Sequence, residues 1–245
     1  MKLPVQLALL AAFLAVGVAG WKGCFRSADG VLLDLAALRR GIATRVLAEE
    51  LARQYSGGRA LIVSNPFVLQ GGQRKEIHQF EEAGVSGLKR GWGDRIQTLG
   101  VVYPELRPEA IQDPASVPID PETRTPLSFL QTPRAWEALL EAHPETQVIV
   151  SLIGVPVNLR ALELWRRPRP ALALIFPDLR MIGDQAGVIA ALQSGKLAAV
   201  VLDRPGSPAE TVPMEKGHLA EFERRFLLIT SNNVHAVLGA YPNLF

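Results

Sequence analysis

Six short apolar runs recur along the chain. They are rich in Val, Ile and Leu, do not alternate with polar residues, and occupy residues 59–66, 98–105, 146–154, 171–178, 197–205 and 226–233. Continuous apolar runs of this length are typical of strands that are buried on both faces, as in parallel sheets. The pattern therefore predicts six strands, most of them parallel.

Stretches with helical periodicity separate these runs. The expected helices cover residues 74–90, 132–142, 158–166, 184–194 and 218–225, and a longer one begins at Asp29 and ends at Gly57-Gly58. Alternating strands and helices require crossover connections, which place helices on both faces of the sheet. The expected fold class is α/β: a doubly wound, mostly parallel six-stranded sheet with helices on both faces, preceded by an N-terminal apolar helix.

Residues 104–133 interrupt this alternation with seven prolines. Proline removes a backbone donor and breaks helices, so the segment is expected to be an extended excursion. Long irregular segments in compact domains are commonly functional or disordered. Two interpretations stay open: a tethered surface loop, and a lid or partner-contact arm.

The N-terminal stretch is apolar from Leu3 to Gly20. It fits a cleaved signal peptide, because small residues precede Gly20. It also fits an uncleaved anchor near the lower length limit of a membrane span, or a lipoprotein acylated at Cys24. All three interpretations place the body outside the cytoplasm. The expected organisation is a signal peptide or membrane anchor in residues 1–26 and an α/β domain with the Pro-rich excursion in residues 27–245.

Charge and cysteine content limit the partners. The chain has 26 Lys and Arg against 24 Asp and Glu, a formal net charge of +2. Basic residues occur in pairs such as Arg39-Arg40 and Arg224-Arg225, interpreted as solvated faces, and no basic tract contains interleaved aromatics. We therefore expect no nucleic-acid partner. The single cysteine, Cys24, excludes a disulfide framework within the chain and a Cys-based zinc site.

Polar residues follow most of the predicted strands. In an open parallel sheet the carboxyl ends of the strands face one edge, here called the carboxyl rim, and ligands bind in the crevice outside it. The candidate ligand-binding residues at this rim are Ser64, Asn65, Glu105, Asp178, Asp203, Ser231, Asn232 and Asn233. Such groups suit a small polar solute, for example a sugar, polyol, amine or amino acid. The same residue types cap helices and shape turns, so a structural role stays open for each.

Catalytic and cofactor motifs are not found in the sequence. It contains no phosphate loop, no dinucleotide-binding glycine pattern and no Gly-x-Ser-x-Gly elbow. Its four histidines are not paired at metal-ligand spacing. We therefore expect no cofactor and no metal and assign no catalytic residue. A hydrolase that uses Asp178 or Asp203 is the weakest hypothesis, with His235 placed to reach the rim after the last strand.

The phrase AALQSGKLAAVVLDRP, residues 190–205, together with the apolar leader and the order of elements, resembles a lobe of the periplasmic type I solute-binding proteins. In that family a strand after such a phrase ends at the binding cleft. The resemblance implies an α/β lobe, a solute site at the carboxyl rim and a periplasmic location. The body is short for two full lobes, and its first strand follows a long helix rather than the leader.

Two functional hypotheses follow. The first is an extracytoplasmic, membrane-associated, solute-binding-like protein without catalysis, whose partner is a small polar solute. The alternative is a structural or accessory subunit of a bacterial envelope or membrane protein complex, whose partner is another envelope protein. The N-terminal apolar helix would attach either one to the membrane.

Overall fold

Six strands form one mixed sheet in the computed structural model, which describes residues 28–242 and 244. The strands are β1 (Gly58–Val63), β2 (Ile96–Val102), β3 (Val148–Ser151), β4 (Ala171–Ile175), β5 (Leu197–Asp203) and β6 (Phe226–Ile229). Their order is β2-β1-β3-β4-β5-β6. Every neighbouring pair is parallel except β5 and β6, which are antiparallel. The six predicted strands and the fold class are confirmed, whereas the apolar helix expected before Ala28 lies outside the described residues.

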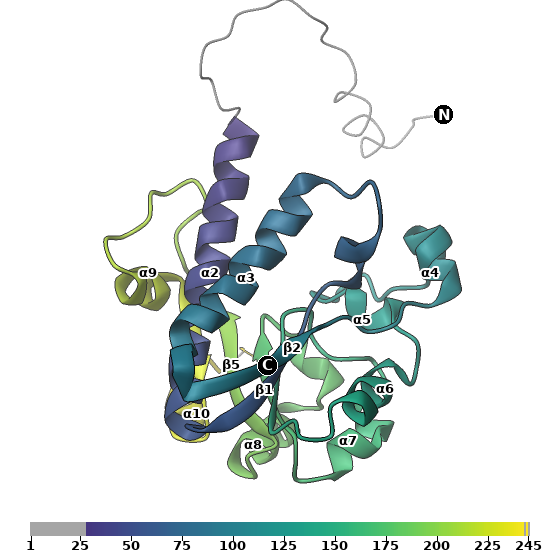
Figure 1. The fold of residues 1–245 in the computed structure, drawn as a ribbon. Helices are drawn as coiled ribbons and strands as arrows, with labels where there is room; N and C mark the ends of the chain where they lie inside the picture. Colours follow the sequence, from purple (N-terminus) through teal and green to yellow (C-terminus); the bar gives the residue numbers. More distant parts are fainter. Residues whose placement is uncertain (1–27, 243, 245) are drawn as a thin grey trace, which may run out of the picture.

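Helices cover both faces of the sheet (Figure 1). One face packs against α2 (Ala28–Gln54), α3 (Lys75–Trp92) and α9 (His218–Arg225). The other face packs against α6 (Ala135–Ala142), α7 (Glu163–Arg166), α8 (Gln185–Gln193) and α10 (Val234–Ala240). Helix α10 is an addition to the sequence prediction. In the described part of the chain, no helix combines the length and the apolar character that crossing a membrane requires.

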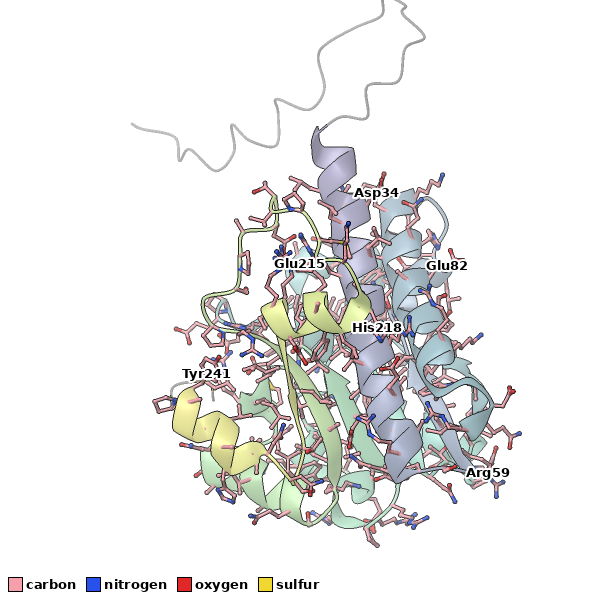
Figure 2. All side chains as sticks on the ribbon, turned by 90° about the vertical axis from the view of Figure 1, so that its left-hand side faces the viewer. Asp34, Arg59, Glu82, Glu215, His218 and Tyr241 are labelled. Carbon is pink, nitrogen blue, oxygen red and sulfur yellow. The ribbon has the colours of Figure 1, made fainter. Side chains whose placement is uncertain are left out.

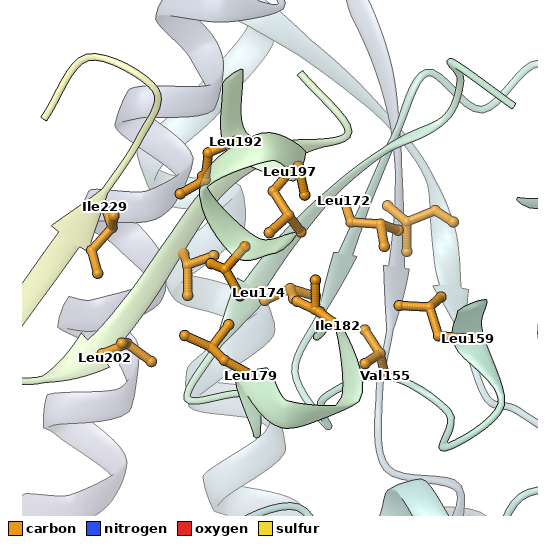
Figure 3. Close-up of a cluster of buried hydrophobic side chains, with 14 of the residues drawn as sticks. Val155, Leu159, Leu172, Leu174, Leu179, Ile182, Leu192, Leu197, Leu202 and Ile229 are labelled. Atoms are coloured by element: carbon orange, nitrogen blue, oxygen red, sulfur yellow. The ribbon is translucent and has the colours of Figure 1, made fainter. Parts of the chain in front are cut away.

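Neighbouring strand residues enter two different cores, which explains why the apolar runs do not alternate. In β4, Leu172 and Leu174 join the core under α8 and α10, shown in Figure 3. Ala173 and Ile175 join the core under α2 and α3. A strand that is covered on both faces gains from an apolar residue at every position.

Helices α2 and α3 pack closely along their length, side by side in Figures 1 and 2. Glycines on α3 permit the close approach. A Cβ atom at Gly87 would lie 2.1 Å from Thr44 Oγ1, and one at Gly91 would lie 2.3 Å from the carbonyl oxygen of Arg45. Any larger residue at these positions would force α3 away from α2.

The Pro-rich segment is folded rather than extended, which corrects the sequence prediction. It contains α4 (Pro108–Gln112) and α5 (Leu127–Leu130). Its own small core consists of Leu106, Ala110, Val117 and Leu130. Proline begins α4 at its first position, where the missing N–H is not needed. Thr125 of this segment packs against the turn after β3, where a Cβ atom at Gly154 would lie 2.7 Å from Cγ2 of Thr125.

Candidate ligand site at the carboxyl rim

A cleft lies along the carboxyl rim, where β1, β3, β4 and β5 end and the N-terminal half of α2 extends beyond the sheet (Figure 1). Its inner compartment, about 480 Å³, lies between α2, α3 and residues 124–127. Its outer compartment, about 1180 Å³, lies between the ends of β4 and β5 and residues 207–210. The compartments share Ala36, Arg40, Phe80, Arg124 and Phe176. We call the two together the rim cleft.

Phe176 lies where the two compartments meet and has a strained backbone. Its φ is 47°, in the left-handed region that bulky side chains avoid, and Pro177 follows it directly. The side chain is half-buried, and its ring lies 5.3 Å from that of Phe226, tilted by 46°. A residue held in this region costs about 1–3 kcal/mol, and such residues cluster at ligand-binding sites.

A buried hydrogen-bond network supports the inner compartment. Nη2 of Arg40 donates to Oε1 of Glu81 and to the carbonyl oxygen of Leu152, each at 2.9 Å. The predicted residue Ser64 belongs to this network, because its hydroxyl donates to Oε2 of Glu81 at 2.7 Å. The guanidinium of Arg40 also lies 4.2 Å above the ring centre of Phe80. Burial lowers the pKa of Arg40, although the charge and hydrogen bond of Glu81 act in the opposite direction.

Asp178 lines the outer compartment but is fully engaged with the protein. Its carboxylate accepts from Nε and Nη2 of Arg180 at 2.9 and 2.7 Å and from the hydroxyl of Thr123 at 2.9 Å. The hydrogen bonds from Arg180 hold its pKa below the usual value against the effect of burial, with help from Thr123. Asp178 therefore joins the end of β4 to the Pro-rich segment.

Asp203 is the more accessible rim carboxylate. Its side chain is 58% exposed, and its nearest ion-pair partner is Arg124, at 4.0 Å. Burial beside the cleft raises its pKa; Arg124 lowers it and Glu210 raises it further. Asn65 lines the inner compartment, so Asn65, Asp178 and Asp203 are brought to the same cleft, with Ser64 beneath it.

Four predicted residues lie away from the cleft. Glu105 bonds the hydroxyl of Thr132 at 3.1 Å and does not line either compartment. Ser231, Asn232 and Asn233 lie toward the opposite edge of the sheet, because β6 is antiparallel and pairs its first residue, Phe226, with Asp203. His235 follows them and contacts Gln193 at the end of α8, so the expectation that it reaches the rim is wrong.

Arginines that line the cleft were not among the predicted site residues. Arg39 and Arg40 were interpreted as a solvated pair, yet their exposed fractions are 4% and 6%. Each is buried because it meets a carboxylate on another helix, Glu221 on α9 and Glu81 on α3, and the sequence gives no signal of these pairings. The Phe-Pro step at the end of β4 marks a turn but does not predict the left-handed conformation of Phe176.

Among the residues that the structure describes, no three His, Cys, Asp or Glu side chains are grouped to hold a metal ion.

Comparison with known proteins finds likeness at the level of the fold. No protein-family model and no curated protein sequence matches the chain. Among solved structures, a periplasmic ribose ABC transporter protein from Conexibacter woesei is 15% identical, with a TM-score of 0.43 over 82% of this chain and 60% of that chain. A carbohydrate transporter solute-binding protein from Agrobacterium radiobacter, in complex with D-arabinose, is 13% identical, with a TM-score of 0.45 over 83% and 63%.

A third solved structure belongs to the same class. An ABC transporter periplasmic solute-binding protein from Actinobacillus succinogenes, with bound D-allose, is 10% identical, with a TM-score of 0.42 over 81% of this chain and 62% of that chain. The chain thus spans about 60% of the length of these proteins. Its resemblance to the periplasmic type I solute-binding proteins is a likeness of fold.

Proposed function

We propose that the chain is an extracytoplasmic solute-binding-like protein that takes a small solute in the rim cleft and performs no catalysis on it. The observation that carries the proposal is the strained Phe176 at the junction of the two compartments. The fold maintains this strain beside a cleft of ligand size, which is how preorganised binding sites are built.

The surroundings of the rim carboxylates favour binding over catalysis. Asp178 accepts hydrogen bonds on both of its oxygens, so it has little freedom to transfer a proton to a ligand. Asp203 is paired only at long range with Arg124, and His235 lies elsewhere. In this proposal Asn65 and Asp203 orient the solute by hydrogen bonds, and the apolar stretch before Ala28 attaches the protein to the membrane.

A thermal-shift screen of the purified protein with sugars, polyols, amino acids and organic acids tests the proposal. A bound solute at about 100 times its Kd should stabilise the fold by about 2.7 kcal/mol. The shift should be lost in Phe176→Ala and kept in Phe129→Ala, another half-buried phenylalanine, which lies outside the cleft lining. A screen in which no solute class shifts the wild-type protein would contradict the proposal.

A subunit of an envelope complex is the second candidate. The observation that favours it is the folded Pro-rich segment, which exposes 53% of Ile111 on α4. Ile111→Ser should release the protein from its native assembly without lowering its stability. Leu219→Ser, 51% exposed on α9, is the matched control. Unchanged migration of the Ile111→Ser protein on native gels would rule against this candidate.

A further inference from the structure

We propose that the solute of the rim cleft is a small organic anion with a flat, apolar body, held by Arg124 and Arg74 and stacked on Phe176. This inference rests on the proposed function and narrows it to one ligand class. It departs from the small polar solute, such as a sugar, polyol, amine or amino acid, that the sequence suggests.

The walls of the inner compartment favour an apolar body. Leu33, Ala36, Ile77, Leu127, Leu152 and Ile153 line it together with the two phenylalanines. Hydroxyl groups of a sugar placed against these side chains would lose their bonds to water without gaining partners. A volume of about 480 Å³ is in the range that accepts a small ring system.

Two phenylalanines supply flat surfaces. Phe176 and Phe80 are both half-buried and line both compartments, so part of each ring remains accessible. The strained backbone of Phe176 and the adjacent ring of Phe226 fix the direction of the first ring. Aromatic rings of this kind favour offset stacking on a planar ligand.

The side chains that line the inner compartment include one more arginine than glutamates. Its charged lining comprises Arg40, Arg74, Arg124, Glu76 and Glu81. Arg40 and Glu81 neutralise each other at 2.9 Å, which leaves Arg74 and Arg124 against Glu76 in this lining. The carboxylate of Asp203, 4.0 Å from Arg124, lines the outer compartment instead.

Both remaining arginines are available to a ligand. Arg124 is 74% exposed, and its nearest carboxylate, that of Asp203, is at 4.0 Å. Arg74 makes no ion pair or side-chain hydrogen bond with any residue in the described part of the chain. A guanidinium binds a carboxylate through two parallel N–H donors, which gives such an anion both affinity and orientation.

The other cleft arginines are already engaged, so they do not compete for the ligand. Arg39 and Arg225 bond Glu221, and Arg180 bonds Asp178. Arg204 donates to the hydroxyl of Tyr241 and to the carbonyl oxygen of Phe226. The anion-binding capacity is thereby restricted to the side of the cleft that adjoins Phe176 and Phe80.

Calorimetric titration of the full-length chain with 1-naphthoate, 1-naphthol and D-ribose tests the inference. We expect 1-naphthoate to bind about tenfold more tightly than the neutral 1-naphthol and to weaken as salt is raised. Arg124→Gln should lower the affinity for 1-naphthoate by about tenfold. Arg59→Gln, at the opposite end of the molecule in Figure 2, should leave it unchanged. Phe176→Leu, which keeps an apolar side chain, should also weaken binding.

The outcomes separate this inference from the proposed function. If D-ribose or another neutral solute binds in a Phe176-dependent way and 1-naphthoate does not bind, the ligand class is wrong and the binding function stands. Binding of 1-naphthoate that is insensitive to both Arg124→Gln and Phe176→Leu overturns the inference. If no solute of any class binds the wild-type protein, the binding function itself fails.

Discussion

Arg39 and Arg40 are consecutive on α2, yet they belong to two different buried clusters and differ in how completely their own side chains are hydrogen-bonded. Each donor nitrogen of Arg39 has a partner: Glu221 and the carbonyl oxygens of Glu210 and Val212. Arg40 bonds through Nη2 alone, and its Nε is buried without a partner. The first, which we call the Glu221 cluster, fixes α9 and residues 208–215 to α2; the second, the Glu81 cluster, supports the cleft.

We assign a stabilising role to the Glu221 cluster and a binding role to the Glu81 cluster. Glu221 is fully buried and accepts hydrogen bonds from Arg39, Arg225, Arg224 and the backbone of Glu215, so it has no capacity left for a ligand. Nε of Arg40 in the Glu81 cluster and Nε of Arg224 in the Glu221 cluster are both buried without a partner. What distinguishes the Glu81 cluster is its position, because Arg40 and Glu81 line the inner compartment.

The largest expected effect comes from Glu221→Gln. Removing this charge leaves buried guanidinium groups uncompensated, which should cost about 3–5 kcal/mol in the free energy of unfolding. Urea denaturation measures it. Glu223→Gln, exposed on the same helix, should stay within about 0.5 kcal/mol. A loss below about 1 kcal/mol would mean that the Glu221 cluster is not a stabilising unit.

Gly87→Ala should affect the stability of the Glu81 cluster and leave that of the Glu221 cluster unchanged. The new methyl would meet Thr44 Oγ1 and the backbone of Gly41, at 2.1 and 2.3 Å, so α3 must move, at a cost of about 3 kcal/mol. Because Glu81 lies on α3 and Glu221 does not, a double-mutant cycle should show coupling with Glu81→Gln and additivity with Glu221→Gln.

The control for this cycle is Gly239→Ala on α10, where a Cβ atom meets nothing within 4 Å. Its stability should change by less than about 1 kcal/mol and in the stabilising direction. Equal coupling of Gly87→Ala to both clusters would show that α2 transmits the displacement as a whole.

Glu81→Gln should cost about 2 kcal/mol, less than Glu221→Gln, because Arg40 keeps the carbonyl of Leu152 and the ring of Phe80. It should also weaken binding in the inner compartment. Glu82→Gln is the exposed neighbour and should change neither quantity. A Glu81→Gln protein as unstable as Glu221→Gln would remove the distinction between the clusters.

Replacing the two rim aspartates should also have unequal effects on the free energy of unfolding. Asp178→Asn loses charged hydrogen bonds to Arg180 and Thr123 and should cost about 1.5 kcal/mol. Asp203→Asn, whose side chain is 58% exposed, should stay within about 0.5 kcal/mol. Thermal denaturation of both variants measures this, and equal losses would contradict the structural role given to Asp178.

The pH dependence provides the finest test. Burial alone would raise the pKa of Glu221, but the hydrogen bonds from Glu215, Arg225 and Arg224 hold it below its ordinary value of 4.5. A carboxyl group whose pKa is lower in the folded state than in the unfolded state stabilises the fold at any pH above its unfolded-state pKa. This stabilisation is lost as the pH falls through the folded-state pKa. The stability gap between wild type and Glu221→Gln should therefore narrow below pH 4.5. A difference in unfolding free energy that stays constant with pH in urea titrations would contradict this prediction.

The sequence predicted the layers of this fold better than its site. Runs such as the one ending at Asp203 are apolar at nearly every position, because a strand that is buried on both faces carries apolar side chains on both. The direction of β6 cannot be predicted from the same pattern, because a short apolar strand has the same composition whether it is parallel or antiparallel. Ser231, Asn232 and Asn233 were assigned to the rim for that reason, and β6 directs them away from it.

The cleft itself depends on contacts that a linear pattern does not contain. Arg40 meets Glu81 across two helices, 41 residues apart in the chain. The Phe-Pro step after β4 does not by itself predict the positive φ of Phe176. The prolines predicted an irregular segment after β2. Its small core around Leu106 depends on the positions of apolar residues within the segment, which the proline content does not reveal.

The reversal at β6 also decides where the protein can be labelled. After β6 the chain returns along α10, so Tyr241 bonds Nη1 of Arg204 and Leu244 lines the outer compartment. Near the start of α2, Leu33 and Ala36 line the inner compartment. A fluorophore or affinity handle fused to either end of the described chain would therefore crowd the cleft. The turn at Gly195, where β5 begins at the opposite edge, offers an attachment point that leaves the cleft accessible.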